Sequence, residues 1–448
     1  MVAENLYNPQ FVLQSGWANN NEFEIPSSIG STGKSWTRVT ATNYNSVGGW
    51  AFTYKFGTNI KVRMFDNILT GSVPNQLPTG TTSDITVNTT NPSDNHDEPD
   101  ISYHPDSQRI IVGFNDRTTT SSAIMDQRFR VFDQSGIALS ATDGYATHTT
   151  LQSQWRPLIE PLQVGSNASS WLYSFTGNNK DTAFINTISS ITPFAFGLSA
   201  DIHMAPSIGT NRNTDQTACE LPNGNFFCAW NEVIGSGRIR WRIFDASGNP
   251  TTSSYNELSA VLTYAKDEPR VKYNLGKIWL TYHHIANPLP GGGEYEGIDI
   301  YACIFDYDSG TGAVTLSVPE FPVHSLTLPG LQRKPELVLY RDRALVVFEH
   351  YPSGVVMGNG IPAYNGNSYI VGRAFKNTGR PLTKTFTIST DISNVSGTHP
   401  YVLRPDISVS LDNNKAMVCW TSGPSNNIYG IGSSGKLWAR ELSLLQIG

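Results

Sequence analysis

The sequence contains little cysteine, little charge and no long apolar run. Its 448 residues include only 4 cysteines, too few for a disulfide framework. No segment approaches the roughly eighteen consecutive apolar residues of a membrane-spanning helix. The start, Met1–Asn8, has neither the basic nor the apolar region of a signal peptide. We therefore expect no membrane span, and no signal peptide is visible.

Charged residues make up 15% of the chain, and the formal net charge is −6 with no Lys/Arg-rich run. A nucleic-acid partner is excluded on this ground, because phosphate backbones are bound by a clustered basic face. No stretch longer than about ten residues has the i, i+3, i+4, i+7 apolar spacing of an amphipathic helix. The 39 Gly and 26 Pro supply turns, and aromatic residues at 11% supply a large core. The composition predicts an all-β globular chain.

Three short patterns recur along the chain. The first ends a strand with Arg-apolar-Phe-Asp or a weaker form of it: Arg63–Asp66, Arg130–Asp133, Arg242–Asp245, Cys303–Asp306 and Arg373–Lys376. The second is a proline opening an alternating strand, where its missing N–H is tolerated: Pro99, Pro157, Pro206, Pro269, Pro335 and Pro400. The third is a strongly apolar strand that occurs seven times: Trp50–Tyr54, Ile110–Phe114, Trp171–Phe175, Phe226–Trp230, Ile278–Tyr282, Ala344–Phe348 and Ala416–Trp420.

A unit of about sixty residues with three recognisable strands and a variable fourth predicts a four-stranded antiparallel sheet. Seven such sheets around an axis would cover both faces of every sheet. The pattern resembles that of β-propeller repeats, including those of large bacterial surface proteins and of proteins with sialidase-like blades. A pair of β-sandwiches is the rival interpretation, but sandwich strands do not repeat one motif seven times.

The resemblance implies one domain over residues 1–448, with seven blades in 36–446 and a closing strand and lead-in in 1–35. We expect Gln10–Gln14 to complete the last blade beside Leu437–Arg440, so that N- and C-terminal strands close the ring. Closure removes exposed sheet edges.

The innermost strands of a propeller line a central channel. Residues just before the strand-opening prolines are therefore expected to form a ring at its mouth: Glu98, Arg156, Ala205, Glu268, Lys334 and His399. Asp-Glu-Pro occurs at two equivalent positions in this set. Carboxylates, cations and imidazoles could supply the acid and base of glycoside hydrolysis or lyase chemistry. The same residues could form ion pairs between blades.

The resemblance to sialidases can be tested on their repeated turn, Ser-x-Asp-x-Gly-x-Thr-Trp. Gly33–Trp36 matches only its last half, with Ser31 where the Asp belongs, and Gly435–Trp438 is a weaker match. The Arg-Ile-Pro signature of their first catalytic arginine is absent, so sialidase activity is discounted. Polysaccharide lyases on seven-bladed propellers use His and Tyr as base and acid. The catalytic candidates, if the chain is an enzyme, are His96, Glu98, Glu268, Tyr282, His283 and His399.

Ligand binding is expected at two kinds of position. The cations Arg156 and Lys334 are at the channel mouth, and Tyr295 and Tyr364 lie in long glycine-rich loops. Long loops on a rigid scaffold commonly carry recognition. Oxygen ligands for Ca²⁺ are offered by Asp94 and Asp97 and by Asp306 and Asp308, although ordinary turn chemistry explains these residues as well. No other cofactor is expected.

Cys219 and Cys228 flank the dipeptide Asn223-Gly224. A two-residue hairpin loop at this dipeptide would place the two cysteines directly opposite each other, close enough for a disulfide. Two small buried hydrophobic residues are the alternative. Cys303 and Cys419 lie in apolar strands and are expected to be inert.

The favoured functional prediction is a non-catalytic propeller for adhesion or assembly, either a virion tail or spike component or a surface module that binds a glycan or a protein. It rests on the missing catalytic signatures, the low charge and the Asn/Thr/Ser/Gly-rich loops. The location expected is extracellular or on a virion surface, and a homo-oligomer or larger assembly is left open. The alternative is an extracellular carbohydrate-active enzyme, a polysaccharide lyase or glycosidase, with its site at the central channel mouth.

Overall fold

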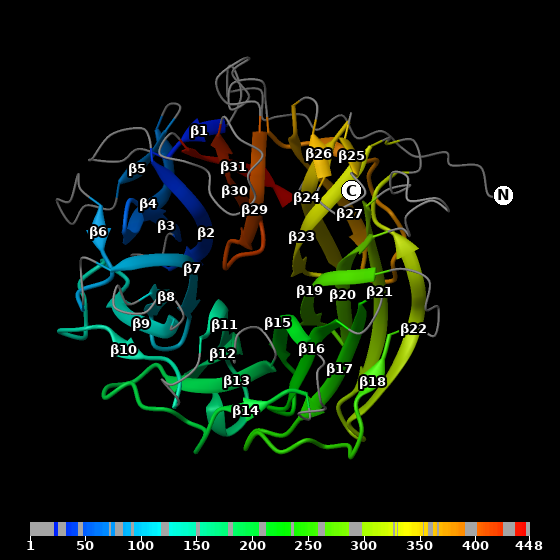
Figure 1. Cartoon of the computed structure of the whole chain (residues 1–448), viewed down its shortest axis with the longest axis horizontal. Helices are drawn as coiled ribbons and strands as arrows, with labels where there is room; N and C mark the ends of the chain where they lie inside the picture. Colours follow the sequence, from blue (N-terminus) through cyan, green and yellow to red (C-terminus); the bar gives the residue numbers. More distant parts are fainter. Residues whose placement is uncertain are drawn as a thin grey trace.

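The computed structural model describes residues 22–25, 33–43, 48–70, 73–76, 84–90, 94–117, 125–148, 153–177, 182–205, 212–233, 237–258, 265–285, 298–325, 328, 330–352, 354–356, 362–364, 367–389, 401–423 and 435–444. These residues form seven antiparallel sheets arranged as blades around an axis (Figure 1). The predicted seven-bladed β-propeller is confirmed. Within this part of the chain the helical structure is one 3₁₀ turn at Gly165–Asn167, and no helix is long and apolar enough to cross a membrane.

Six blades have their strands in chain order from the axis outward, and blade 7 has its first three strands in this order with the N-terminal strand of the chain outside them. The inner strands are β2 (Lys34–Thr42), β7 (Asn95–His104), β11 (Trp155–Leu162), β15 (Arg212–Glu220), β19 (Ala265–Asn274), β23 (Leu331–Tyr340) and β29 (Tyr401–Val409). The second strands are β3 (Gly49–Phe56), β8 (Arg109–Arg117), β12 (Ser170–Gly177), β16 (Phe226–Val233), β20 (Lys277–Ile285), β24 (Arg343–Tyr351) and β30 (Lys415–Gly423). All seven predicted apolar strands are these second strands.

The third strands are β4 (Asn59–Thr70), β9 (Met125–Asp133), β13 (Thr182–Ser189), β17 (Arg238–Phe244), β21 (Ile298–Asp308), β27 (Tyr369–Lys376) and β31 (Lys436–Ser443). The outer strands are β6 (Ile85–Thr86), β10 (Gly144–Tyr145), β14 (Ile202–His203), β18 (Asn256–Glu257), β22 (Ala313–Pro322), β28 (Phe386–Thr387) and β1 (Glu22–Glu24). In addition, β5 (Val73–Gln76) pairs with β4, and β25 (Gly354–Val356) pairs with β26 (Pro362–Tyr364).

The ring is closed by strands from the two ends of the chain. The N-terminal strand β1 pairs antiparallel with β31, placing Phe23 opposite Ala439, and so becomes the outer strand of blade 7. Figure 1 shows the blue strand β1 beside the red strands of the last blade. Closure by the two ends is therefore confirmed, but through Glu22–Glu24. The expected Gln10–Gln14 lies outside the described residues.

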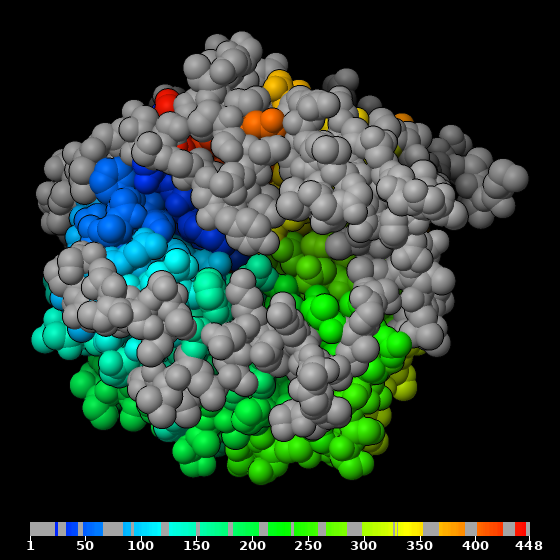
Figure 2. Space-filling model, in the orientation of Figure 1, coloured from blue at the N-terminus to red at the C-terminus, as the bar shows by residue number. Residues whose placement is uncertain are grey.

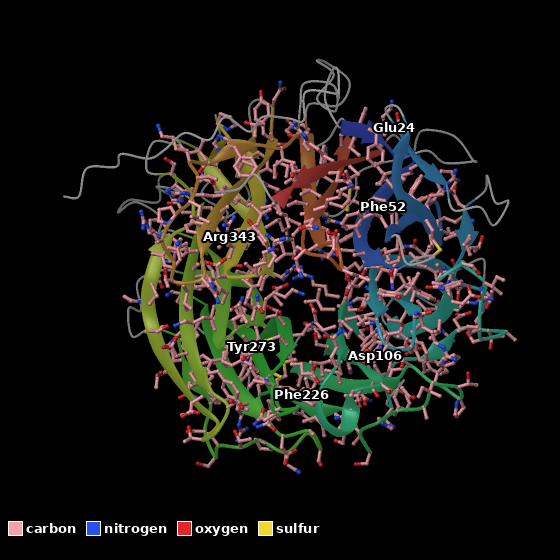
Figure 3. All side chains as sticks on the ribbon, turned by 180° about the vertical axis from the view of Figure 1, so that it is seen from behind. Glu24, Phe52, Asp106, Phe226, Tyr273 and Arg343 are labelled. Carbon is pink, nitrogen blue, oxygen red and sulfur yellow. The ribbon has the colours of Figure 1, made fainter. Side chains whose placement is uncertain are left out.

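The hydrophobic core lies in the wedges between blades. Seven buried clusters each combine side chains of two neighbouring blades. In β3, for example, Phe52 faces blade 7 while Ala51 faces blade 2. Both faces of a blade are buried, so these strands are continuous apolar runs and do not alternate with polar residues. Figure 3 shows side chains filling the spaces between neighbouring blades, with Phe52 and Phe226 inside the ring of sheets.

Five of the largest buried side chains are tryptophans of the second strands. They are each at most 1% exposed: Trp50, Trp171, Trp230, Trp279 and Trp420. They are packing residues of the core. Trp279 also donates a hydrogen bond of 2.8 Å from Nε1 to Asn377 Oδ1 of the next blade.

The recurring Arg-apolar-Phe-Asp motif links neighbouring blades. Its arginine lies on the third strand, with the guanidinium 5.5 Å from the ring of Phe132 in the case of Arg130. Arg130 donates to the backbone carbonyl of Val87 in blade 1, and Arg373 donates to the carbonyl of His324 in blade 5. In each case the arginine donates to a backbone carbonyl just beyond the end of an outer strand, and so gives that oxygen a hydrogen-bond partner.

The inner strands share a β-bulge at one position. In every blade the register shifts there, and the first residue after the shift has a positive φ between 46° and 56°. In five blades a proline follows this residue: Pro99, Pro157, Pro269, Pro335 and Pro405. The prediction that the proline opens the strand is wrong by a few residues. A bulge tolerates proline for the same reason as a strand end, because no ladder donor is needed.

Cys219 and Cys228 do not face each other. Cys219 is paired with Phe227, and the two cysteines point to opposite faces of blade 4, into different core clusters. The loop has three residues, Pro222 to Gly224, with the Gly224 N–H bonded to Leu221 O at 2.9 Å and Gly224 at φ 78°. This is a type I turn with a glycine bulge, and one extra loop residue reverses the side-chain parity of the hairpin.

We expect all four cysteines to be free thiols. Titration with a thiol reagent in denaturant, without reductant, should count 4 thiols per chain. The native protein should react slowly, because burial raises the pKa of Cys219, Cys228, Cys303 and Cys419 and keeps the thiolate from forming. A count of two would contradict the register described above.

Candidate functional site

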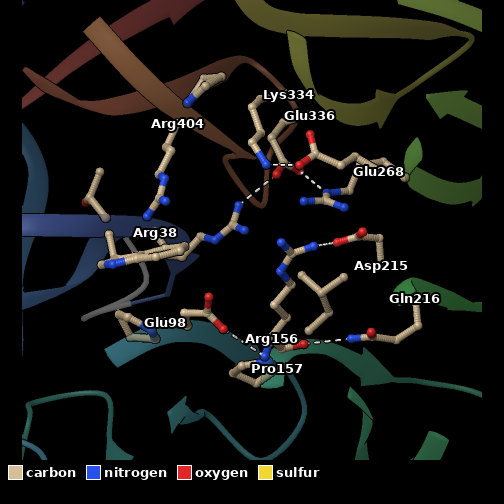
Figure 4. Close-up of a pocket in the computed structure, with 16 residues that line it drawn as sticks. Arg38, Glu98, Arg156, Pro157, Asp215, Gln216, Glu268, Lys334, Glu336 and Arg404 are labelled. Carbon is tan, nitrogen blue, oxygen red and sulfur yellow. Dashed lines mark hydrogen bonds and ion pairs between the residues drawn. The ribbon is translucent and has the colours of Figure 1, made fainter. Parts of the chain in front are cut away.

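The seven bulge residues form a ring around one end of the channel. They are Trp36, Glu98, Arg156, Asp215, Glu268, Lys334 and Arg404. All seven line one pocket together with the residues that follow them in each strand (Figure 4). The water-accessible space inside it is about 70 Å³, several times what a water molecule needs. We call this pocket the mouth pocket and its seven bulge residues the bulge ring.

Four of the six residues expected at the channel mouth lie on the bulge ring: Glu98, Arg156, Glu268 and Lys334. Ala205 does not, because it is 3% exposed and packs between blades 3 and 4, where Asp215 takes the ring position. His399 lies outside the described residues, and Arg404 holds the place in blade 7. Trp36 is the member from blade 1.

Charges on the bulge ring pair across neighbouring blades. Arg156 forms an ion pair with Asp215, and Lys334 forms one with Glu268. Glu98 accepts hydrogen bonds from Asn115 Nδ2 at 2.8 Å and from the backbone N–H of Arg156 at 3.0 Å. Neighbouring inner strands diverge too far to pair as a sheet, and side chains of the ring bridge them.

A second layer of charge lies two residues further along five of the seven inner strands, while blades 3 and 4 have Leu158 and Thr217 there. The Arg38 guanidinium is 2.8 Å from Glu336 Oε1, 3.3 Å from Asp406 Oδ1 and 3.8 Å from Asp100 Oδ1. Glu336 Oε2 is in turn 2.9 Å from Arg270 Nε. Glu336 therefore sits between two arginines at the floor of the mouth pocket.

The pKa of one carboxylate in this layer is lowered, and the pKa values of the other two are raised. Burial would raise the pKa of Glu336, but Arg270 and Arg38 outweigh it and hold that pKa below its usual value. Burial raises the pKa of Asp100 to about 7 and that of Asp406 to about 6, in each case against the attraction of Arg38. Separated pKa values among neighbouring carboxyl groups are typical of acid and base sites.

Glu268 also contacts the buried His283. His283 Nδ1 lies 3.2 Å from Glu268 Oε2, and Nε2 lies 3.8 Å from Asp267 Oδ2. Burial lowers the pKa of His283 to about 4, although Asp267 acts in the opposite direction. The imidazole is therefore neutral at pH 7, and its Nδ1 atom faces the Glu268 carboxyl without a hydrogen bond between the two.

Arg404 differs from the other cations of the mouth pocket. Its guanidinium carbon lies 3.1 Å from the centre of the Trp36 ring. Its backbone N–H donates to Glu349 Oε1 at 2.7 Å, but the guanidinium has no ion pair or hydrogen bond within the part of the chain that the structure describes. Burial lowers its pKa to about 9, against the attraction of Glu98 and Glu349.

Other predicted residues lie away from the mouth pocket. His96 is 0% exposed, with Nδ1 2.8 Å from Thr58 O and Nε2 3.2 Å from Asp116 Oδ1. Tyr282 is 0% exposed and hydrogen-bonds to Glu320. Tyr295 lies outside the described residues, and Tyr364 lies in the short hairpin of β25 and β26.

The four candidate Ca²⁺ ligands are spread over two blades. Asp94 and Asp97 are at the start of blade 2, and Asp97 contacts Asn115 and Arg117. Asp306 pairs with Lys277, while Asp308 accepts hydrogen bonds from Gly310 and Thr311 in its own turn. Among the described residues, no group of three or more His, Cys, Asp or Glu gathers as ligands for one metal ion.

Below the Arg38–Glu336–Arg270 bridge the channel widens toward the opposite face. This lower cavity has a water-accessible volume of about 590 Å³ and is lined by residues of β2, β7, β11, β15, β19, β23 and β29. An ion pair between Lys272 and Glu160 lies within it. The bridge separates the lower cavity from the mouth pocket, so a molecule entering at the mouth passes the bulge ring and then meets Glu336 at the floor.

The sequence analysis missed Trp36, Asp215, Arg404 and the whole second layer of charge. A signal for part of this set exists, because Arg404–Ser408 repeats the pattern of Glu98–Ser102: charged, Pro, Asp, Ile, Ser. If blade 7 is aligned with the other blades on Pro405 in place of Pro400, Arg404 and Asp406 fall at the positions of Glu98 and Asp100. Blades 1 and 4 have Thr37 and Gln216 in place of the proline, so the sequence gives no marker there.

Comparison of the sequence with models of known protein families and with characterised proteins gives no match. The fold is similar to that of solved structures. A GH93 α-L-arabinofuranosidase of Fusarium graminearum in complex with arabinobiose aligns with TM-score 0.51 and 11% identity over 96% of this chain and 98% of its own. An α-L-arabinanase of Penicillium chrysogenum gives TM-score 0.46 and 10% identity over 92% and 94%. A protein of unknown function from Dyadobacter fermentans gives 0.44 and 10% over 94% and 97%.

The likeness with TM-score 0.51 shows the fold, and it corrects the favoured functional prediction. The prediction of a non-catalytic adhesion or assembly protein, with a virion component as its example, is contradicted, because a propeller that matches 96% of this chain is a GH93 α-L-arabinofuranosidase. Nothing in the comparison supports a virion surface. The error arose from treating missing sialidase motifs as evidence against catalysis, although one fold carries many unrelated sites.

The buried His283 should make stability depend on pH. Its pKa of about 4 lies below the unfolded value of about 6.5, so its contribution is complete above pH 6.5 and is lost as pH falls toward 4. We expect the wild type to lose about 2 kcal/mol relative to His283→Asn between pH 7 and pH 5. Urea unfolding of both proteins at the two pH values measures this. Other shifted groups, including Asp100, are common to both proteins and cancel. Parallel pH profiles would mean that His283 is not buried in a neutral form.

Proposed function

We propose that the chain is a glycoside hydrolase whose active site is the mouth pocket. The observation that carries the proposal is that two carboxylates of neighbouring blades, Glu268 and Glu336, line one small pocket in different electrostatic environments. Glycoside hydrolysis requires two such groups, one to protonate the leaving oxygen and one to act at the anomeric carbon.

Glu336 is the candidate for the ionised carboxylate. Arg38 and Arg270 hold its two oxygens at 2.8 Å and 2.9 Å and keep its pKa low. In this state it can face the positive charge that develops on the sugar ring, either as nucleophile or as the base that activates water. The arginines also fix its orientation, which lowers the cost of reaching the reactive geometry.

Glu268 is the candidate for the proton donor. It lies between Lys334 and the neutral His283, whose Nδ1 atom is 3.2 Å from Glu268 Oε2, and in its protonated state Glu268 carries the proton to be donated. Donation of that proton to the glycosidic oxygen breaks the C–O bond, and water supplies the hydroxyl group and the replacing proton. Glu268 and His283 were both candidates on sequence grounds.

Backbone strain in the bulge ring favours a role for its side chains. A left-handed conformation costs a non-glycine residue about 1 kcal/mol or more, and glycine would avoid this cost. None of the seven ring positions is glycine, and six carry charge. Non-glycine residues with a strained backbone conformation cluster at functional sites.

Arabinose-containing glycans are the first substrates to test, because the fold is similar to that of an arabinofuranosidase. Trp36 supplies an aromatic ring in the mouth pocket. Action outside the cell is part of this proposal, since polymeric glycans of this kind are met there.

Glu336→Gln should lower kcat by about 10²-fold to 10⁴-fold, the usual contribution of an acid or base group. Glu268→Gln should do the same, with a smaller loss on substrates that have a good leaving group, since those need little proton donation. Release of new reducing ends from a glycan panel that includes arabinan is the measurement. The matched control is Glu257→Gln on the outer strand β18, where Glu257 pairs with Arg238 and Arg240. Full activity of both pocket variants, or no turnover by the wild type on any glycan, would rule out this site.

A further inference from the structure

The positive charge of Arg404 has no counter-ion in the mouth pocket. The pocket is lined by five cations, Arg38, Arg156, Arg270, Lys334 and Arg404, but only by four carboxylates, Glu98, Asp215, Glu268 and Glu336. Arg156 pairs with Asp215, Lys334 pairs with Glu268, and Glu336 joins Arg38 to Arg270. Arg404 is therefore the cation of this lining that forms no ion pair with any residue that the structure describes, and the further carboxylates Asp406 and Asp100 lie against Arg38, not against Arg404.

Arg404 is held in one orientation by its aromatic neighbour. Its guanidinium stacks on the Trp36 ring with 3.1 Å between the guanidinium carbon and the ring centre. The contact with the ring leaves the guanidinium N–H donors without a hydrogen bond among the described residues, and such donors suit a planar partner such as a carboxylate. Figure 4 shows the side chain extending into the mouth pocket, with no interaction drawn to it.

The position of Arg404 is also costly. Its φ of 56° is strained, and Trp36 beside it is strained as well, with φ 55°. Burial lowers the pKa of Arg404 to about 9, so the surroundings do not compensate its charge. Glu98 and Glu349 attract it from a distance, whereas Arg156 and Arg38 repel it. An arriving anion would supply the compensation that the protein lacks.

We propose that the mouth pocket recognises an acidic sugar, whose carboxylate or sulfate group is bound by Arg404 stacked on Trp36. The inference rests on the proposed function in that the ligand is a glycan, and it narrows the substrate class from glycans in general to anionic glycans. Arg404 binds and orients the substrate, while Glu268 and Glu336 carry the chemistry.

Binding of matched oligosaccharides by calorimetry tests this proposal without relying on turnover. The probes are an oligogalacturonide with its methyl ester, and a sulfated galactan oligomer with its desulfated form. We expect one charged member to bind at least about tenfold more tightly than its neutral form, and the difference to shrink at high salt. Preference within the first pair identifies a uronate, and preference within the second identifies a sulfate ester.

Arg404→Gln should remove that preference and leave the weak binding of the neutral form unchanged. Arg404→Lys should restore it in part, since lysine keeps the charge without the planar fork. The control is Arg341→Gln, which removes an arginine at φ 50° from an exposed turn in blade 6. Arg341 contacts Asn414 at 2.6 Å and does not line the mouth pocket. An unchanged melting temperature shows that each variant is folded.

Equal binding of charged and neutral forms by the wild type, or no binding of either charged probe, would overturn the inference. So would an equal loss for all probes in Arg404→Gln. If that variant fails to fold, the salt dependence of the wild type and the Arg404→Lys variant still decide the question. Selective binding of a charged probe without cleavage would contradict the proposed hydrolase and keep the acidic-sugar site. Cleavage of neutral glycans without a preference for charged ones would support the proposed hydrolase and contradict the acidic-sugar site.

Discussion

Every blade of this protein has two apolar faces, and neither can be left in water. Covering them by neighbouring blades is the constraint on which the rest of the structure depends. The seven inter-blade clusters satisfy it, with the second strands as the most buried layer. A row of such sheets would end in two exposed faces, whereas a ring has none. The surface in Figure 2 accordingly shows blades 1 to 5 meeting side by side around the central hollow.

The same packing explains why charged side chains lie close together at the axis. Inner strands of neighbouring blades do not form a common sheet, so their polar groups must be satisfied by side chains, as when Asp406 Oδ2 accepts the Val39 N–H at 2.6 Å. Carboxylates and arginines are therefore needed at the centre for structural reasons alone. The bulge in each inner strand then turns one further side chain per blade toward the mouth. The proposed site with Glu268, Glu336 and Arg404 lies on a framework that already places charges there.

The blade pattern could be predicted from the sequence because it depends on local features. Apolar second strands, turn glycines and the Arg-apolar-Phe-Asp motif each occur within a few residues. Positions on the bulge ring were predicted only where a proline follows the bulge residue. These positions are Glu98, Arg156, Glu268 and Lys334. Asp215 has no proline beside it, and Pro400 misled the search for Arg404. Partners such as Arg38 and Glu336, 298 residues apart, meet only through ring closure, which no local pattern contains. The prediction that Cys219 and Cys228 face each other was wrong, because the hairpin loop has one residue more than the expected two.

Blade 7 is built from both ends of the chain, and this has a consequence for folding. Lys436 and Glu24, 412 residues apart, form an ion pair 3.1 Å long across the β1–β31 junction. On the ribosome the first blades can assemble early, but the last cannot be completed until β31 has emerged. Until then two apolar faces remain open, and the N-terminal strand waits as an unpaired edge. A high contact order of this kind slows folding and prolongs exposure to aggregation. A growing chain that stalls late in synthesis would therefore be a natural client for chaperones.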